Sequence, residues 1–294
     1  MSKITLCWWN TSLSPSGRDR AIPSDATVFQ KVIEHLIGSL DVDFCVLGEV
    51  SETDVESIRH FLKDSTYEVV SGVEPLGRSS FSTCLLFNSS KLTCQLGSHE
   101  LLMQEQSKYR IAQHAVLATC DLKTIFHIFI SHWPSRLHLA ANDPLRSTLG
   151  DRLRQRVDKV FEANDSAQII LMGDYNDEPF DQSLSSCLRA TRDKDLAKKK
   201  STLLYNPFWR HLCHLDIAAN PSESQSTSES WGSYFHQGGT LFKWRTFDQM
   251  LFSSSFLGLG EWYLDENHTS IIKDGLNNSN RDVLLPPSSS SFWF

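Results

Sequence analysis

The sequence has no Cys-x-x-Cys pair, no apolar stretch near the roughly 20 residues of a membrane span, and no excess of basic residues. Its seven cysteines are scattered and odd in number, which indicates reduced thiols and predicts a cytoplasmic protein without membrane association. The N-terminal Met-Ser-Lys-Ile-Thr-Leu run is too short for a signal peptide. A net charge of −7 argues against a passive nucleic-acid coat, but not against an enzyme that meets phosphate through a metal ion.

The length and composition are those of a globular chain. With 294 residues, 40% of them hydrophobic and 21% charged, it is long enough for one large α/β domain or two small ones. No internal repeat is visible, and no linker is long enough to divide the chain. We therefore expect a single domain over residues 1–294.

Hydrophobic periodicity predicts alternating helices and strands. A mobile polar segment is expected at 222–230 and a basic loop at 194–200. The pattern implies a two-sheet sandwich flanked by helices, with antiparallel pairing between residues 67 and 130. The expected strands are 4–9, 43–47, 67–70, 83–87, 111–119, 124–130, 168–172, 233–235 and 247–252, and the expected helices begin near residues 25, 51, 145 and 181.

The most informative stretch reads Leu-Met-Gly-Asp-Tyr-Asn-Asp-Glu-Pro, at residues 171–179. Asp174 and Asn176 are two residues apart, so an extended backbone places both side chains on the same face at the end of a strand. A carboxylate can deprotonate or hold a water, and an amide can orient an anion or bind a hard metal. The alternative is an Asx-type turn that only closes the strand.

Polar residues follow four other predicted strands or lie at their ends: Asn10, Glu49, His132 and Asp248. Each has an ordinary structural explanation. Asn10 can form a turn, Glu49 can begin a helix, His132 can pack in a loop, and Asp248 can be an edge-strand charge. Five such coincidences are less probable than one site in which carboxylate and amide oxygens hold a divalent cation and a histidine relays a proton or binds phosphate.

The chain resembles the endonuclease/exonuclease/phosphatase family over roughly residues 3–256, with a divergent tail from about 257. The resemblance implies a four-layered α/β sandwich with two mixed, largely antiparallel sheets flanked by helices, and metal-dependent hydrolysis of phosphoesters. The matching motifs are Asn10, Gly48-Glu49, Ser131-His132-Trp133-Pro134-Ser135, Gly173-Asp174-Tyr175-Asn176-Asp177-Glu178-Pro179, Leu204-Tyr205-Asn206-Pro207-Phe208-Trp209, Trp231-Gly232-Ser233-Tyr234-Phe235 and Phe247-Asp248-Gln249.

Motif matching also implies roles at the metal and at the attacking water. Glu49 would bind Mg²⁺ or Mn²⁺ with Asn10 close by. Asp174 would position or activate the water, and Asn176 would orient the phosphate.

The remaining roles concern the phosphate and the proton relay. His132 would contact the scissile phosphate or the leaving group, and Asp248 would orient a histidine near the C-terminus. Arg110 and Arg136 are weaker candidates for phosphate contacts, and solvated surface is the alternative for both.

The sequence departs from the family near its end. The family's Ser-Asp-His motif is missing: Asp282 could take the aspartate position, but Val283, which follows it, cannot transfer a proton. His268 could replace the histidine in space, although a surface loop is the simpler interpretation. Loss of one group that stabilises the transition state costs on the order of a hundred- to a thousand-fold in rate.

These observations predict a metal-dependent phosphodiesterase, with DNA as the expected substrate and internal cleavage as the expected mode. One alternative is a phosphatase or phosphodiesterase acting on a small-molecule, lipid or inositol phosphate, which suits the acidic charge. The other is a catalytically weakened binding subunit whose aromatic end, residues 292–294, contacts a protein partner. A nuclease should show a basic rim, for which 198–200 and the arginines of 152–156 are candidates.

Overall fold

The computed structural model describes residues 3–15, 23–76, 79–104, 107–120, 124–212, 232–236, 244–258, 260–272 and 292–293. The chain divides into two compact units, each containing one large sheet. Unit 1 comprises Met1–Thr93, Cys213–Trp244 and Ser270–Phe294, and unit 2 comprises Cys94–Leu212 and Arg245–Thr269. The single domain expected over residues 1–294 stays a prediction.

Unit 1 is built on a six-stranded mixed sheet with the order β16-β17-β1-β2-β6-β3. β1 and β2 run parallel, whereas β6 runs antiparallel to both of its neighbours, and β17 runs antiparallel to β1 and β16. All five residues of β2 are buried, as expected for a strand inside a sheet. The bounds are β1 Leu6–Asn10, β2 Phe44–Gly48, β3 Tyr67–Ser71, β6 Thr83–Asn88, β16 Ile271–Ile272 and β17 Phe292–Trp293.

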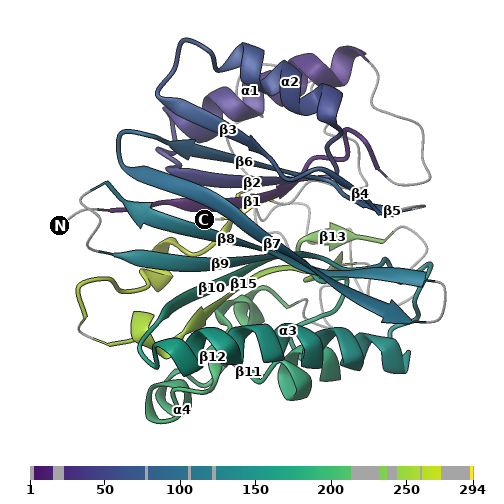
Figure 1. The fold of residues 1–294 in the computed structure, drawn as a ribbon, viewed down its shortest axis with the longest axis vertical. Helices are drawn as coiled ribbons and strands as arrows, with labels where there is room; N and C mark the ends of the chain where they lie inside the picture. The colour runs from purple at the N-terminus through teal and green to yellow at the C-terminus, as the bar shows by residue number, and fades with distance from the viewer. Residues whose placement is uncertain are drawn as a thin grey trace, which may run out of the picture. The chain divides into compact units, whose positions relative to one another are not determined.

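Helices α1 (Pro23–Gly38) and α2 (Glu52–Phe61) cover this sheet, as Figure 1 shows. Their apolar residues form one buried cluster with side chains from β1, β2 and β6. The start of α2 is defined by a capping box, in which the Ser51 hydroxyl accepts from the Asp54 N–H and the Asp54 carboxylate accepts from the Ser51 N–H. Both helices confirm the pattern read from the sequence.

Unit 2 contains a seven-stranded mixed sheet with the order β11-β12-β15-β10-β9-β8-β7. β9 and β10 run parallel, whereas β15 runs antiparallel to β10 and β8 antiparallel to β9. The α/β fold with mixed sheets flanked by helices is therefore confirmed. The bounds are β7 Leu92–Gln104, β8 Ser107–Thr119, β9 Ile125–His132, β10 Gln168–Asp174, β11 Ala190–Thr191, β12 Leu204–Tyr205 and β15 Asp248–Ser253.

Helix α3 (Pro144–Ala163) lies along this sheet (Figure 1) and begins after Asp143, whose carboxylate accepts from the Leu145 N–H. Leu149, Leu153 and Val157 of α3 join a cluster of buried side chains from β8, β9, β10 and β15. The predicted helix beginning near residue 145 is confirmed.

Three expectations differ from the structure. The basic loop expected at 194–200 is helix α4 (Lys194–Lys199), because the Asp193 side chain accepts from the Leu196 N–H and caps a helix start that the lysine-rich composition conceals. The helix expected from residue 181 is a short π-helical turn, η1 (Ser183–Cys187). β7 was missed because its outer positions are polar and mostly exposed. The expected mobile segment 222–230 lies outside the described residues.

Short elements complete the chain. No helix within the described ranges is both long and apolar enough to cross a membrane. The short elements are β4 Glu74–Leu76, β5 Ser79–Phe81, η2 Pro207–His211, β13 Tyr234–Phe235, β14 Trp244–Arg245, η4 Ser254–Phe256 and η5 Glu266–His268.

Candidate active site

Three of the predicted site residues of unit 2 stand side by side across three strands. Asp174 ends β10, His132 ends the parallel β9, and Asp248 begins the antiparallel β15. Asp174 is the register partner of both His132 and Asp248. Residues in register on neighbouring strands point to the same face of a sheet, so the three side chains share one face at one edge.

Asp174 and His132 are close but are not joined by a direct hydrogen bond. His132 Nε2 lies 3.9 Å from Asp174 Oδ2, beyond hydrogen-bond length. Burial lowers the pKa of His132 to about 3, and the positive charge of Arg110 acts in the same direction. His132 is therefore a neutral imidazole at neutral pH, which can donate one hydrogen bond and accept another. The electrostatic effect on His132 places Arg110 near this end of the site.

The turn after β10 holds Asp174 and Asn176 together. The Asn176 N–H donates to Asp174 Oδ1 at 2.8 Å, and the Asn176 Nδ2 donates to the Trp133 carbonyl at 3.1 Å. Asn176 has a φ of 51°, in the left-handed region that asparagine tolerates better than most residues. The Asx-type turn weighed as the alternative is thus present, and it orients the carboxylate so that Oδ2 faces His132.

Gly173 lets β10 approach β9 closely where the site begins. Its φ is 144°, and a Cβ added there would lie 1.8 Å from the Ser131 carbonyl oxygen. Ser131 is the register partner of Gly173, one residue before His132. The glycine of the motif is therefore required by sterics at the point where Asp174 is placed beside His132.

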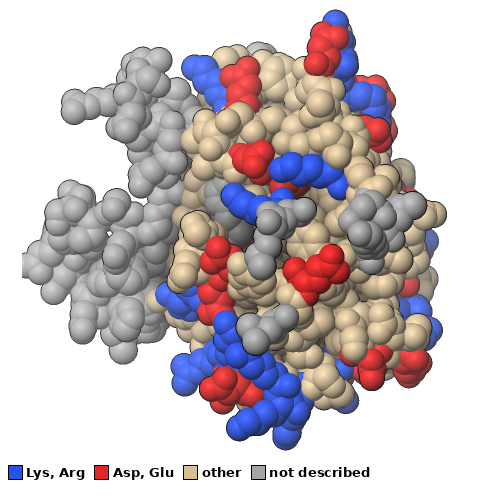
Figure 2. Space-filling model, turned by 90° about the vertical axis from the view of Figure 1, so that its left-hand side faces the viewer, with Lys and Arg blue, Asp and Glu red and all other residues tan. Residues whose placement is uncertain are grey.

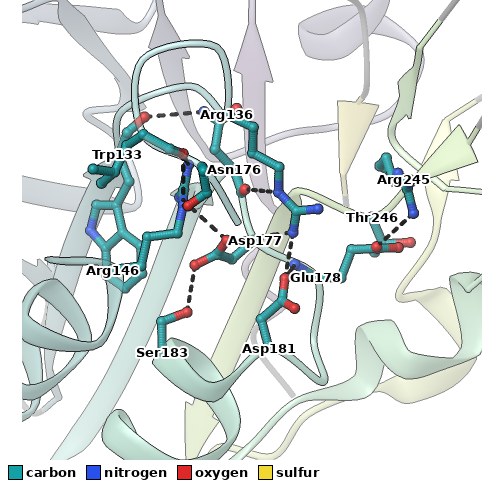
Figure 3. A network of polar contacts seen from close by, with 12 residues as sticks. Trp133, Arg136, Arg146, Asn176, Asp177, Glu178, Asp181, Ser183, Arg245 and Thr246 are labelled. Atoms are coloured by element: carbon teal, nitrogen blue, oxygen red, sulfur yellow. Dashed lines mark hydrogen bonds and ion pairs between the residues drawn. The ribbon is translucent and has the colours of Figure 1, made fainter. Parts of the chain in front are cut away.

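A buried charge network lies under the turn, and the sequence reasoning missed it (Figure 3). Asp177 accepts from the Ser183 hydroxyl at 2.5 Å and forms an ion pair with Arg146 at 3.3 Å. Arg146 is 1% exposed and also donates to the carbonyl oxygens of Leu139 and Pro134. Burial raises the pKa of Asp177 to about 6 in spite of the ion pair. The available signal was an arginine at a position that shares the apolar face of α3.

Arg136 extends this network to the site. Its Nε donates to the Asn176 carbonyl at 2.8 Å, and its Nη2 contacts Asp181 at 2.5 Å and Asp177 at 3.4 Å. The guanidinium also lies 4.7 Å from the centre of the Phe247 ring. Arg136 thus has protein partners at this site, and the phosphate contact expected for it stays a prediction.

The two predicted residues of unit 1 stand together at one edge of the other sheet. Asn10 ends β1 and is the register partner of Gly48, which ends the parallel β2 and precedes Glu49. Glu49 has a φ of 57°, and its carbonyl accepts from the Ser14 N–H at 2.7 Å. The carboxyl ends of two adjacent parallel strands therefore carry an amide and a carboxylate, as the sequence predicted.

His268, the candidate replacement for the missing histidine, is a surface residue. Its side chain is 81% exposed, and its Nδ1 lies 2.8 Å from the carboxylate of Asp265. Asp248, by contrast, is 5% exposed. This contrast favours the surface-loop interpretation of His268. The tail positions Asp282 and Val283 lie outside the described residues.

A cation at this site would need oxygen donors from the protein. No three His, Cys, Asp or Glu side chains gather closely enough to hold a metal ion in the part of the chain that the structure describes. Mg²⁺ binds through one or two carboxylates and keeps several waters. The Glu49 carboxylate and the Asn10 amide supply oxygen donors of that kind, and Asn10 Oδ1 also accepts from the Ser12 N–H at 3.4 Å. The chemistry of these two groups fits a hard divalent cation.

In unit 2, the carboxylates of Asp174 and Asp248 and the imidazole of His132 lie at one end of the sheet, and groups of this class can exchange protons or bind an anion. The Endonuclease/Exonuclease/phosphatase family model matches residues 30–263, and the chain belongs to this family. A comparison with curated proteins finds no match.

Solved structures share the fold at low sequence identity. The human Nocturnin catalytic domain with bound sulfate anion has a TM-score of 0.56 and 16% identity, covering 99% of this chain and 93% of that one. Truncated TDP2 from Caenorhabditis elegans has a TM-score of 0.55 and 15% identity, covering 98% and 94%. A Bacteroides thetaiotaomicron mannosyl-6-phosphatase has a TM-score of 0.56 and 14% identity, covering 99% and 98%. These likenesses show the fold.

Proposed function

We propose that this protein is a divalent-metal-dependent phosphodiester hydrolase that cleaves DNA internally. The observation that carries the proposal is the in-register row of His132, Asp174 and Asp248 at one sheet edge. Membership of the Endonuclease/Exonuclease/phosphatase family supports phosphoester chemistry at these residues.

The proposed mechanism assigns one task to each group. Glu49 and Asn10 would hold Mg²⁺ or Mn²⁺, which when bound would supply Lewis-acid polarisation of a phosphoryl oxygen. Asp174 accepts a hydrogen bond from the attacking water through Oδ2, because the Asn176 N–H engages Oδ1. The Asn176 amide and the neutral His132 imidazole orient the phosphate oxygens. Asp248 lies beside Asp174 as its register partner and adds a second carboxylate to the site.

The choice of DNA draws on the distribution of basic residues. Lys and Arg gather at the lower end of the face shown in Figure 2, the end at which α4 lies in Figure 1. α4 carries Lys198 and Lys199 in its last turn, and both are exposed. Exposed lysines of this kind can contact a phosphate backbone without reading sequence. Lys198 lies beside Asp165 and Ser166, at the opposite end of β10 from Asp174, so α4 would contact the backbone away from the catalytic groups.

A small phosphate ester is the second candidate, and two observations favour it. The chain carries a net charge of −7, and two of the three arginines proposed as a basic rim are engaged elsewhere. Arg154 is buried and pairs with Asp158, and Arg156 pairs with Glu100. One solved structure of the same fold is that of a mannosyl-6-phosphatase.

The deciding experiment compares substrates under controlled metal conditions. Supercoiled plasmid, linear duplex, single-stranded DNA, RNA and a panel of sugar and inositol phosphates are incubated with Mg²⁺, Mn²⁺ or EDTA. We expect metal-dependent plasmid nicking that is lost in Asp174→Ala and Glu49→Ala and retained in the surface control His268→Gln.

Each other outcome has a defined meaning. Phosphate release from a small ester without nicking would transfer the assignment to the second candidate. Unchanged cleavage in both acidic variants would reject the site. Metal-dependent cleavage lost in His268→Gln would make His268 the replacement histidine. Inactivity on every substrate would favour a weakened member that acts as a binding subunit.

The protein partner expected through the aromatic end remains to be tested. Phe292–Trp293 forms strand β17, whose backbone pairs with β1 and β16 of the same chain. Size-exclusion chromatography of the chain with and without residues 288–294 tests this proposal, and an unchanged monomer counts against it. The six described cysteines form no disulfide with one another, and the reduced state and cytoplasmic location stay proposals.

A further inference from the structure

Arg136 belongs to one of the three segments that carry the candidate catalytic residues of unit 2, and it contacts the other two. It lies four residues after His132, in the loop that follows β9. Its Nε donates to the carbonyl of Asn176, in the turn after β10. Its guanidinium stacks on the ring of Phe247, directly before Asp248 at the start of β15. The side chain of Arg136 therefore links the loop after β9 to the turn after β10, as Figure 3 shows, and to the residue before β15.

Two carboxylates in the segment after the Asn176 turn hold the guanidinium of Arg136. Nη2 of Arg136 pairs with Asp181 at 2.5 Å and with Asp177 at 3.4 Å. Asp181 also accepts from the Glu178 N–H at 2.7 Å, and Asp177 is 0% exposed. The side chain of Arg136 is 24% exposed, but its guanidinium is bound on one side by carboxylates and on another by the Asn176 carbonyl. A planar guanidinium held in this way has a defined orientation that a lysine ammonium cannot reproduce.

The contact with Asn176 has a conformational consequence. Asn176 is held at a φ of 51°, which costs free energy unless its surroundings compensate. Its backbone N–H, its carbonyl and its side-chain amide are each hydrogen-bonded, to Asp174, Arg136 and the Trp133 carbonyl respectively. If the carbonyl contact is lost, the turn can rotate, and the Asp174 carboxylate loses the bond that directs its Oδ2 toward His132.

We propose that Arg136 is a positioning residue: held by Asp181 and Asp177, it fixes the Asn176 turn and so the orientation of the Asp174 carboxylate. This inference rests on the proposed function for its catalytic consequence. It replaces a phosphate contact with an indirect role. A substrate contact would change substrate affinity, whereas a positioning role changes the rate of the chemical step.

The test compares Arg136→Gln with Arg136→Lys and with a matched control, Arg210→Gln. Arg210 is also an arginine of unit 2 paired with a carboxylate, that of Glu266. We expect kcat to fall about 100-fold in Arg136→Gln, as a small misplacement of catalytic groups does, with little change in KM. Arg136→Lys should recover part of the loss and Arg210→Gln should show none. In a double-mutant cycle, Arg136→Gln should cost little once Asp174 is already asparagine, because the carboxylate that Arg136 orients is then absent. A rise in KM with kcat unchanged, or an additive cycle, would overturn the proposal.

A second readout does not depend on turnover. Hydrogen exchange of the peptide covering residues 173–179 should accelerate in Arg136→Gln and stay at the wild-type rate in Arg210→Gln, with thermal unfolding recorded to confirm that both variants fold. Unchanged exchange in Arg136→Gln would refute the positioning role. If wild-type protein cleaves no substrate, the proposed function fails and this exchange experiment alone decides the inference.

Discussion

Asp174 and His132 end two neighbouring parallel strands as direct register partners, with His132 Nε2 3.9 Å from Asp174 Oδ2. This separation is too long for a hydrogen bond between them and suits two groups that contact a common third partner. A water or a phosphate oxygen is the partner that the proposed hydrolysis requires. In the proposed hydrolysis, the carboxylate and the neutral imidazole would therefore contact one reacting group from adjacent directions.

The carboxylate charge of Asp174 can be removed without removing its turn. In Asp174→Asn the amide oxygen can still accept from the Asn176 N–H, so the turn is kept while the basic group is lost. We expect kcat/KM to fall on the order of a hundred- to a thousand-fold, with the midpoint of thermal unfolding unchanged. Steady-state kinetics on the best substrate check this, with Asp165→Asn as a surface control. Wild-type kinetics in Asp174→Asn would remove this carboxylate from the mechanism.

The pH dependence of stability should report the buried His132. Its folded pKa of about 3 lies below the unfolded value of about 6.5. The unfolded chain binds the proton first, so the stability contributed by neutral His132 is present above pH 6.5 and is lost as pH falls toward 3. The slope for one proton is about 1.4 kcal/mol per pH unit.

The substitution His132→Gln should remove the pH-dependent contribution of His132 to the free energy of unfolding. We expect the free energy of unfolding of the wild type to fall more steeply between pH 6.5 and 4 than that of the variant, measured by urea unfolding at several pH values. The exposed His268→Gln should follow the wild-type curve. Parallel curves for wild type and His132→Gln would show that His132 titrates near its ordinary pKa in the folded protein.

Strand ends were predictable because two local signals agreed at each of them. Apolar periodicity stops at Asp174, His132 and Glu49, and polar residues of the right chemistry follow. The structure places the first two in register and puts Glu49 one residue after the register partner of Asn10. Local sequence could therefore indicate which residues share a sheet edge.

Contacts that cross between elements were not predictable in the same way. Asp177 meets Arg146 from a different element, 31 positions away along the chain (177 − 146). Nothing in either local pattern specifies the partner, although Arg146 on an apolar helix face indicates that some acceptor must exist. The contact between Arg136 and Asn176 was not predictable for a related reason, since the acceptor is a backbone carbonyl, which leaves no trace in side-chain chemistry.

Removing the Asp177 carboxylate from the buried pair that it forms with Arg146 should lower the free energy of unfolding substantially. Asp177→Ala leaves a buried guanidinium without its carboxylate, and removing one partner of such a pair costs about 3–5 kcal/mol. Asp177→Asn should cost less, because the amide oxygen of asparagine can still accept hydrogen bonds from Arg146 or from the Ser183 hydroxyl. Urea unfolding at pH 7 measures both, with Glu56→Gln, from an exposed pair, as the near-neutral control.

The same pair has a pH signature of opposite sign to that of His132. The folded pKa of Asp177, about 6, lies above its unfolded value, so the folded state favours the protonated carboxyl. Stability from this group is present below pH 4 and is lost as pH rises through 6. Asp177→Asn should flatten the curve between pH 4 and 7. A wild-type slope retained in Asp177→Asn would assign the titration to another group.

Gly173→Ala should reduce catalysis more than it reduces the stability of the fold. A Cβ at this position would lie 1.8 Å from the Ser131 carbonyl oxygen, and the backbone φ of 144° is itself unfavourable for alanine. The strain is relieved by moving the end of β10 away from β9, which separates Asp174 from His132.

For Gly173→Ala we expect a loss of about 1–3 kcal/mol in stability from the backbone conformation. The proportional loss in kcat should be larger than the loss in the folded fraction. Thermal unfolding and kcat at saturating substrate measure the two effects. Gly38→Ala, at the end of α1, is the control, because a Cβ added there would have no heavy atom within 4 Å. Full activity in folded Gly173→Ala would show that the spacing of Asp174 and His132 does not set the rate.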